Sequence, residues 1–266
     1  MADKNHLNMI ITGHIDNGKS TTMGHFLMDL GVVDEITIAA HAEESEKTGK
    51  GDTFKYAWVM DNIKDERERG ITIDLAFQKF ETPKFFFTLI DAPGHRDFIK
   101  NMITGASEAD AAVLVLSAKE GETDTAIAPG GQAREHAFLL KTLGVSQLIV
   151  AINKMDDSKF SEDAYNAAKA KGEQLVKSVG YKLDQVPFIP VSGWTGDNLV
   201  KKSENMGWYK GKTLLEAFDD FKVPEKPTGK PLRLPIQDVY SITGVGTVPV
   251  GRVETGTMKP DRKSVV

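Results

Sequence analysis

A glycine-rich loop with a lysine and a hydroxyl residue at fixed spacing lies near the start of the chain. Residues 13–20 read Gly13-His14-Ile15-Asp16-Asn17-Gly18-Lys19-Ser20, and Thr21 follows. The two glycines of this Gly-x-x-x-x-Gly-Lys-Ser pattern let the backbone turn until successive N–H groups point inward at phosphate oxygens. Lys19 can then reach the β- and γ-phosphates of a nucleotide, and the Ser20 hydroxyl can ligate Mg²⁺. Residues 13–21 are therefore predicted to bind a mononucleotide.

A second candidate for phosphate chemistry follows the apolar run of residues 85–90. There the chain reads Asp91-Ala92-Pro93-Gly94-His95. An acidic residue at the end of a buried strand can hold Mg²⁺, usually through water. Gly94 can offer its backbone N–H to a γ-phosphate because it has no side chain in the way. Taken alone, the motif is equally typical of a tight turn capped by an aspartate, but the loop upstream favours the metal site.

The base of the nucleotide is predicted by a third motif, Asn153-Lys154-Met155-Asp156, at the end of another apolar run. An aspartate carboxylate can accept two hydrogen bonds from N1–H and the exocyclic amine of guanine, a pair that adenine does not present. Lys154 can lay its aliphatic stem across the base. Further along, Ser192-Gly193-Trp194 could add contacts to the guanine carbonyl. These residues favour GTP over ATP.

The elements that must position these motifs are visible as short apolar runs alternating with helical patterns. The runs are residues 8–11, 85–90, 111–116, 148–152 and 186–191. Short runs that are apolar almost throughout are typical of strands covered on both faces. Helices are expected from residue 21 to 30, around 133–143, and between the last two runs, ending at Gly180. The alternation predicts a parallel sheet with helices on both faces.

Residues 71–78 differ from the other strands because apolar and polar residues alternate. Ile71, Ile73, Leu75 and Phe77 form the apolar set, which predicts a half-exposed strand near a sheet edge. Upstream, the spacing of apolar residues between 56 and 63 predicts an amphipathic helix. The charged run 65–69 lies between them. Such runs are usually solvated, but this position leaves a functional role open.

Composition limits the class of protein. The chain has 266 residues, 40% of them apolar and 27% charged, no cysteine and a net charge of −5. The absence of cysteine excludes disulfides and thiolate sites. The acidic balance argues against strong nonspecific binding of nucleic acid by the whole surface but leaves a local basic patch open, and we expect no DNA partner. No secretory signal or membrane-spanning run is found, so we expect a cytoplasmic protein.

Two domains are expected, with a break marked by proline and glycine. Residues 1–222 are predicted to form the nucleotide-binding domain, 223–231 a linker and 232–266 an incomplete β-barrel domain. The last segment has too few residues to close a barrel, because an average strand takes about five or six.

Five motifs occur in the order found in the translational GTPases, and together they resemble that family, in particular its archaeal and eukaryotic elongation factors. They are residues 13–20, 66–73, 91–95, 153–156 and 192–194. The resemblance implies an α/β fold: a P-loop GTPase domain, mostly a parallel sheet with helices on both faces, followed by the start of a β-barrel domain. Its implied cofactors are GTP or GDP and Mg²⁺. Its implied partners are aminoacyl-tRNA, the ribosome and a guanine-nucleotide exchange factor.

The resemblance also implies roles for single residues. Thr72 would ligate Mg²⁺ together with Ser20 and Asp91, and only while the γ-phosphate is present. His95 would position the attacking water once the ribosome orders it. Ile15 and Ile71 would form an apolar gate that keeps His95 away until then. The other histidines, His6, His25, His41 and His136, show no metal-ligand spacing and are expected on helix faces or at the surface.

Two departures from the family pattern leave alternatives open. Asn17 stands where the family usually has histidine, and the chain ends inside the first of two expected barrels. The alternatives are a paralogue that serves termination, ribosome rescue or selenocysteine delivery, a P-loop kinase or ATPase, and a fragment that binds nucleotide without useful turnover.

Overall fold

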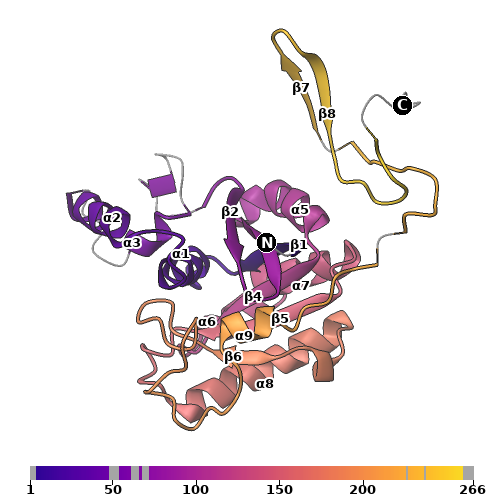
Figure 1. Cartoon of the computed structure of the whole chain (residues 1–266). Coiled ribbons are helices and arrows are strands. Elements are labelled where there is room, and N and C mark those ends of the chain that lie inside the picture. Colours follow the sequence, from indigo (N-terminus) through magenta and orange to yellow (C-terminus); the bar gives the residue numbers. More distant parts are fainter. Residues whose placement is uncertain are drawn as a thin grey trace. The chain divides into compact units, whose positions relative to one another are not determined.

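The computed structural model describes residues 4–47, 54–60, 66–67, 72–225, 227–236 and 238–259. It divides into two compact units, residues 1–221 and 222–266 (Figure 1). Within the described residues, no helix combines the length and apolar character that crossing a bilayer requires.

The first unit is built on a six-stranded sheet with the order β2-β3-β1-β4-β5-β6. The strands are β1 (Asn5–Gly13), β2 (Ala76–Glu81), β3 (Phe85–Asp91), β4 (Ala111–Ser117), β5 (Gln147–Asn153) and β6 (Phe188–Pro190). All neighbouring strands pair in parallel except β2, which runs antiparallel to β3 at the edge. Both the parallel sheet and the edge position of the alternating strand are confirmed.

Helices and short 3-10 turns connect these strands. They are α1 (Lys19–Asp29), α2 (Glu35–Lys47), α3 (Phe54–Ala57), η1 (Arg96–Phe98), α5 (Ile99–Glu108), α6 (Glu122–Ile127), α7 (Gln132–Thr142), α8 (Glu162–Val179), η2 (Leu183–Gln185) and α9 (Leu214–Phe218). The longest, α8, begins where the Ser161 side chain accepts from Ala164 N and ends at Gly180, whose φ of 94° only glycine adopts readily.

The core lies on both faces of the sheet, and β4 shows why. Its side chains alternate between two apolar clusters, with Leu114 on the side of α5, α7 and α8, and Val113 on the side of α1 and α9. Every residue of β4 is buried. Because both faces are covered, the sequence of this strand is apolar from Ala111 to Leu116.

The edge strand begins later than expected. β2 starts at Ala76, and its buried residues are Ala76 and Phe80, whereas Phe77 is 48% exposed. The predicted phase of the alternation was therefore wrong at Phe77. Residues 73–75 stay out of the ladder because side chains bind their N–H groups instead.

The predicted helix across residues 56–63 is also shorter than expected. Among the described residues of this stretch, the helix is α3, which ends at Ala57 and is followed by a turn in which Trp58 and Met60 are buried. Ile63 and Ile71 lie outside the described residues.

The second unit contains an antiparallel pair, β7 (Asp238–Ile242) and β8 (Gly246–Val250). Gly244 and Gly246 in the connecting turn have φ values of 84° and 100°, which side chains with a Cβ rarely adopt. An isolated bridge joins Arg233 to Thr255.

Candidate nucleotide-binding site

The glycine-rich loop connects the end of β1 to the start of α1 and folds closely against β4. A Cβ on Gly13 would lie 2.4 Å from the carbonyl oxygen of Val115, so only glycine fits there. Gly18 precedes α1 with a φ of 78°. Asp16 also has a positive φ, at 62°. The Lys19 Nζ donates to His14 O at 3.0 Å, so the lysine curls back over the loop. The predicted residues 13–21 thus run from the last residue of β1, through the loop, into the first turn of α1.

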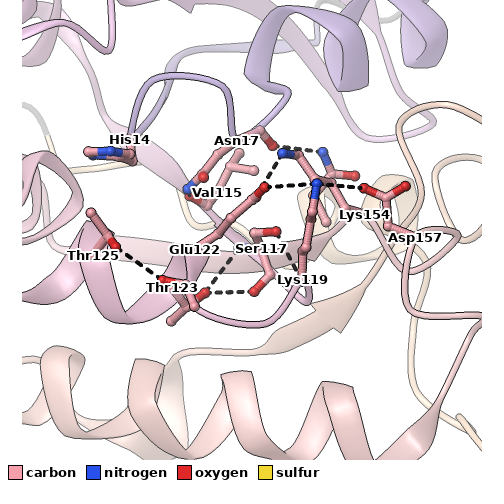
Figure 2. Close-up of polar contacts among 12 residues, drawn as sticks. His14, Asn17, Val115, Ser117, Lys119, Glu122, Thr123, Thr125, Lys154 and Asp157 are labelled. Carbon is pink, nitrogen blue, oxygen red and sulfur yellow. Dashed lines mark hydrogen bonds and ion pairs between the residues drawn. The ribbon is translucent and has the colours of Figure 1, made fainter.

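Asn17, the unusual residue of this loop, is 1% exposed and anchors the loop to the sheet. Its Nδ2 donates to Val115 O at 2.9 Å. Figure 2 labels both residues. Its own carbonyl oxygen accepts from Asn153 Nδ2 at 2.8 Å. Asn17 therefore connects the loop to both β4 and β5.

Three predicted metal ligands come together from separate segments. Ser20 Oγ donates to Asp91 Oδ2 at 2.6 Å and lies 3.1 Å from Thr72 Oγ1. Asp91 is fully buried at the end of β3, and its Oδ1 has no hydrogen-bond partner among the described residues. Burial raises the pKa of Asp91 to about 6, although the Ser20 hydrogen bond and Lys19 oppose the shift.

This donor set fits Mg²⁺. Asp91 has a buried carboxylate oxygen with no partner among the described residues, and the hydroxyl oxygens of Ser20 and Thr72 lie close together beside this carboxylate. Carboxylate and hydroxyl oxygens are the hard ligands that Mg²⁺ prefers. Within the described part of the chain, no group of three or more His, Cys, Asp or Glu side chains could hold a metal ion. The set at Ser20 therefore differs from an all-carboxylate or histidine site, as expected for an ion that is shared with phosphates.

The segment after Asp91 packs onto the loop. A Cβ on Gly94 would lie 2.4 Å from Lys19 Nζ and 3.0 Å from Ile15 N, so a side chain would collide with the phosphate-binding residues. His95 turns the other way: its Nδ1 accepts from Asp97 N at 3.2 Å and caps η1. Its side chain is 33% exposed. The apolar gate predicted from Ile15 and Ile71 stays a prediction, because Ile71 lies outside the described residues.

The predicted guanine-binding residues gather at the ends of β5 and β6. Asn153 is 3% exposed and its Oδ1 accepts from Gly193 N at 2.8 Å. Ser192 Oγ donates to Asp156 Oδ1 at 2.5 Å, which joins two of the predicted base-binding motifs. A Cβ on Gly193 would lie 2.4 Å from Thr22 Oγ1, so this loop also lies against α1.

Trp194 and Lys154 complete this end of the site. The Trp194 ring packs edge-on against Tyr56, with ring centroids 6.0 Å apart, and Lys55 Nζ lies 5.0 Å above it. Lys154 has a φ of 62°, and its Nζ pairs with Glu122 Oε2 at 2.7 Å.

Glu122 was missed by sequence reasoning. It begins α6, and a second lysine, Lys119, lies 3.5 Å from its other oxygen (Figure 2). Burial opposes ionisation of Glu122, but hydrogen bonds from Lys154 and Ser117 and the charges of the two lysines outweigh it and lower the pKa. The ion pair with Glu122 thus fixes the position of the Lys154 ammonium next to the base motif. No spacing in the sequence links Glu122 to Lys154, so only the fold could identify the pair.

His136 is on a helix face, as expected, but it is fully buried beneath the loop. Its Nδ1 lies 2.7 Å from Thr12 Oγ1 on β1. The nearby Gln132 Oε1 accepts from Ile15 N at 3.4 Å. Gln132 of α7 thus contacts the loop itself, and His136 contacts the strand that leads into it.

A sheet of this order, with a glycine-rich loop between β1 and α1, hydroxyl and carboxylate oxygens at its mouth and an Asn-Lys-x-Asp motif beside it, defines a P-loop GTPase. A sequence model of the elongation factor Tu GTP binding domain matches residues 4–224, so the chain belongs to that family. The resemblance to the translational GTPases is confirmed.

Several known proteins are similar over nearly the whole chain. Elongation factor 1-alpha of Cenarchaeum symbiosum (strain A) is 88% identical over 100% of this chain and 61% of its own length. Elongation factor 1-alpha of Ignicoccus hospitalis is 59% identical over 99% of this chain and 60% of its own length. The crystal structure of Sup35 complexed with GDP is 32% identical, with a TM-score of 0.63, and covers 98% of this chain and 55% of that one. The chain thus spans about 60% of the length of the curated relatives that it matches.

Proposed function

We propose that this chain is the GTPase portion of a translation elongation factor that delivers aminoacyl-tRNA to the ribosomal A site and hydrolyses GTP on codon recognition. One observation carries the proposal. The side-chain oxygens of Ser20, Thr72 and Asp91 lie together at one end of the loop. At the other end, Asn153, the first residue of the base motif, donates a hydrogen bond to the carbonyl oxygen of Asn17. Family membership supports guanine-nucleotide binding, and the elongation factor 1-alpha relatives support the role in translation.

At the phosphate end, each residue would act by position and charge. Lys19 would place its ammonium on the β- and γ-phosphates, and the N–H groups of residues 13–21 would surround them. Ser20 and Thr72 would hold Mg²⁺ directly and Asp91 through water. When bound, the ion would neutralise charge that develops on the phosphate oxygens.

Hydrolysis would depend on His95, which in its present rotamer caps η1. We infer that the ribosome reorients this side chain so that it positions the attacking water next to the γ-phosphate. Gly94 would donate its N–H to the γ-phosphate, which its close approach to Lys19 supports. Ile15 and Ile71 would gate the movement. A histidine held out of place would keep the intrinsic rate slow.

At the base end, Asp156 would accept from N1–H and the exocyclic amine of guanine. Ser192, Gly193 and Trp194 would bind near the guanine carbonyl, and Asn153 would hold the two loops together. The Lys154 stem would cover the base while Glu122 holds its ammonium. The second unit would be the start of a β-barrel domain, with residues 223–231 as the linker after a GTPase domain of residues 1–222.

The partners proposed are aminoacyl-tRNA, the ribosome and a guanine-nucleotide exchange factor in the cytoplasm, with neither a membrane nor DNA involved. The first test is competition of GTP and ATP for the site against a fluorescent GDP analogue. Displacement by GTP alone is expected, and preference for ATP would contradict the proposal.

The second test is hydrolysis of GTP with and without programmed ribosomes. Stimulation by ribosomes is expected, and His95→Ala should abolish it while leaving GDP affinity unchanged. His6→Ala, which changes an exposed histidine of β1, is the matched control. Delivery itself is tested with the chain extended to the full length of its relatives: aminoacyl-tRNA should be captured with GTP and released with GDP. Equal capture in both states would remove delivery from the proposal.

A further inference from the structure

The backbone between Thr72 and β2 is held by side chains rather than by a neighbouring strand. Glu66 Oε1 accepts from both Ile73 N and Asp74 N, each at 3.0 Å. Asp74 Oδ1 in turn accepts from Leu75 N at 2.8 Å. Residues 72–75, here named the Thr72 segment, therefore depend on a carboxylate from the charged run upstream, whose functional role was left open by the sequence.

The Glu66 side chain is buried, and the adjacent residue, Arg67, makes contacts of its own. Glu66 is 2% exposed, which is unusual for glutamate and indicates a specific role. Next to it, Arg67 Nη1 lies 3.4 Å from Glu44 on α2, and its guanidinium lies 5.4 Å above the Trp58 ring. These contacts hold Arg67, the residue next to Glu66, against α2 and Trp58.

A second hold on the Thr72 segment comes from α5, the helix that follows His95. Asn101 Nδ2 donates to Ile73 O at 2.9 Å and lies 3.3 Å from Asp74 Oδ1. One turn further along the same helix face, a Cβ on Gly105 would lie 2.9 Å from Leu75 Cδ2. The segment thus packs on α5 through one polar and one apolar contact.

We propose that Glu66 and Asn101 are positioning residues that clamp the Thr72 segment so that Thr72 Oγ1 faces Ser20, and that Asn101 links this segment to the helix that carries the His95 loop. The clamp rests on the proposed function, since it acts through Thr72 as a ligand needed only in the triphosphate state. It contributes to the binding of GTP and not to that of GDP. Glu66 and Asn101 touch neither nucleotide nor metal; they act through the backbone of Ile73 and Asp74.

The test compares dissociation constants for GDP and for a non-hydrolysable GTP analogue, both with Mg²⁺. Asn101→Asp keeps the shape of the side chain but places a carboxylate against Ile73 O and the Asp74 carboxylate, both of which need a donor. We expect analogue affinity to fall about tenfold or more and GDP affinity to stay within about twofold. Glu66→Gln, which keeps an acceptor oxygen without its charge, should give a smaller loss in the same direction.

Two matched control variants distinguish a loss of the clamp from a general effect on the structure. Asn8→Ala removes an amide that donates to Glu108 O at the other end of α5, at 3.0 Å. Glu216→Gln changes a carboxylate that accepts from the Thr213 backbone at 2.8 Å, in the cap of α9. Both should leave the ratio of GTP-analogue to GDP affinity unchanged.

Three outcomes decide the matter. A selective loss of analogue affinity in Asn101→Asp, absent from the controls, supports the clamp. Equal losses for both nucleotides, or no loss, overturn it while the proposed function stands. Failure of the unmodified chain to bind either guanine nucleotide overturns the proposed function and the clamp together. If Glu66→Gln does not fold, the result for Asn101→Asp decides whether the clamp exists. Asn101 is only partly buried, so this variant is expected to fold.

Discussion

The Ser20 hydroxyl donates to the Asp91 carboxylate across 2.6 Å, joining the first turn of α1 to the end of β3. The Ser20 hydroxyl also lies 3.1 Å from Thr72 Oγ1, and the second carboxylate oxygen of Asp91 has no hydrogen-bond partner among the described residues. Under the proposed function, the affinity for Mg²⁺ would depend on these residues, which are far apart in the sequence.

Ser20→Ala should therefore weaken Mg²⁺-dependent GDP binding about 10- to 100-fold, because one ligand and one charge-assisted hydrogen bond are lost. The measurement is GDP affinity in Mg²⁺ and again in EDTA, where the variant should match the unmodified chain. Ser107→Ala, at a half-buried position of α5 whose hydroxyl donates to Thr104 O, is the control. Equal losses with and without Mg²⁺ would argue against a metal ligand.

Asp156→Asn should change the preferred base from guanine to xanthine. An amide presents a donor where the carboxylate accepts, and xanthine offers an acceptor in place of the guanine amine. GDP affinity should fall at least about 100-fold while xanthosine diphosphate binds better than it does to the unmodified chain. Asp157→Asn changes the neighbouring carboxylate, 3.9 Å from Lys119, and should alter neither affinity substantially. Unchanged base preference in Asp156→Asn would remove this residue from the base site.

Asn17→Ala should lower the free energy of unfolding by about 1–3 kcal/mol, because Val115 O would lose a buried donor. It should also speed GDP dissociation, since the loop loses its anchor to β4. Urea denaturation and stopped-flow dissociation measure the two effects.

Tyr181→Phe is the comparison for Asn17→Ala. It removes a hydroxyl that donates to Val145 O at 2.8 Å, a buried bond of the same kind away from the loop. It should lower stability similarly and leave GDP dissociation unchanged. Identical dissociation kinetics in both variants would show that Asn17 only stabilises the fold.

His136 should make stability depend on pH. Burial lowers the pKa of His136 from 6.5 to about 3, and the charges of Lys19 and His14 add to the shift. Between these values the unfolded chain binds more protons than the folded one, so the free energy of unfolding falls as pH falls below about 6.5. The loss is about 1 kcal/mol between pH 7 and pH 5.5.

Urea denaturation at these two pH values tests the role of His136. His136→Gln keeps a polar partner for Thr12 and should remove this part of the pH dependence. His6→Gln, at an exposed position, should retain it. A pH dependence that survives in His136→Gln would assign it to other groups.

Much of the fold could be read from local patterns. β4 and β5 are apolar almost throughout because both faces of the sheet are covered, and the alternation of such runs with helical patterns predicted a parallel sheet with helices on both sides. The start of β2 could not be predicted in this way. The strand was expected to include Ile73, but the backbone of Ile73 forms hydrogen bonds with the side chains of Glu66 and Asn101 and not with a neighbouring strand. Both partners come from other parts of the chain.

The sequence by itself determined the family of the chain and predicted which residues would hold phosphate, metal and base, because each motif is a short run whose spacing is dictated by backbone geometry. Glycines at 13 and 18, the Lys19-Ser20 pair and the Asp91-Gly94 turn are of this kind. Only the tertiary structure decided how those motifs are supported. The contacts of Asn17 with Val115, Lys154 with Glu122, and Ile73 with Asn101 join residues that the chain keeps apart, and such contacts exist only once the sheet has brought its helices and loops together.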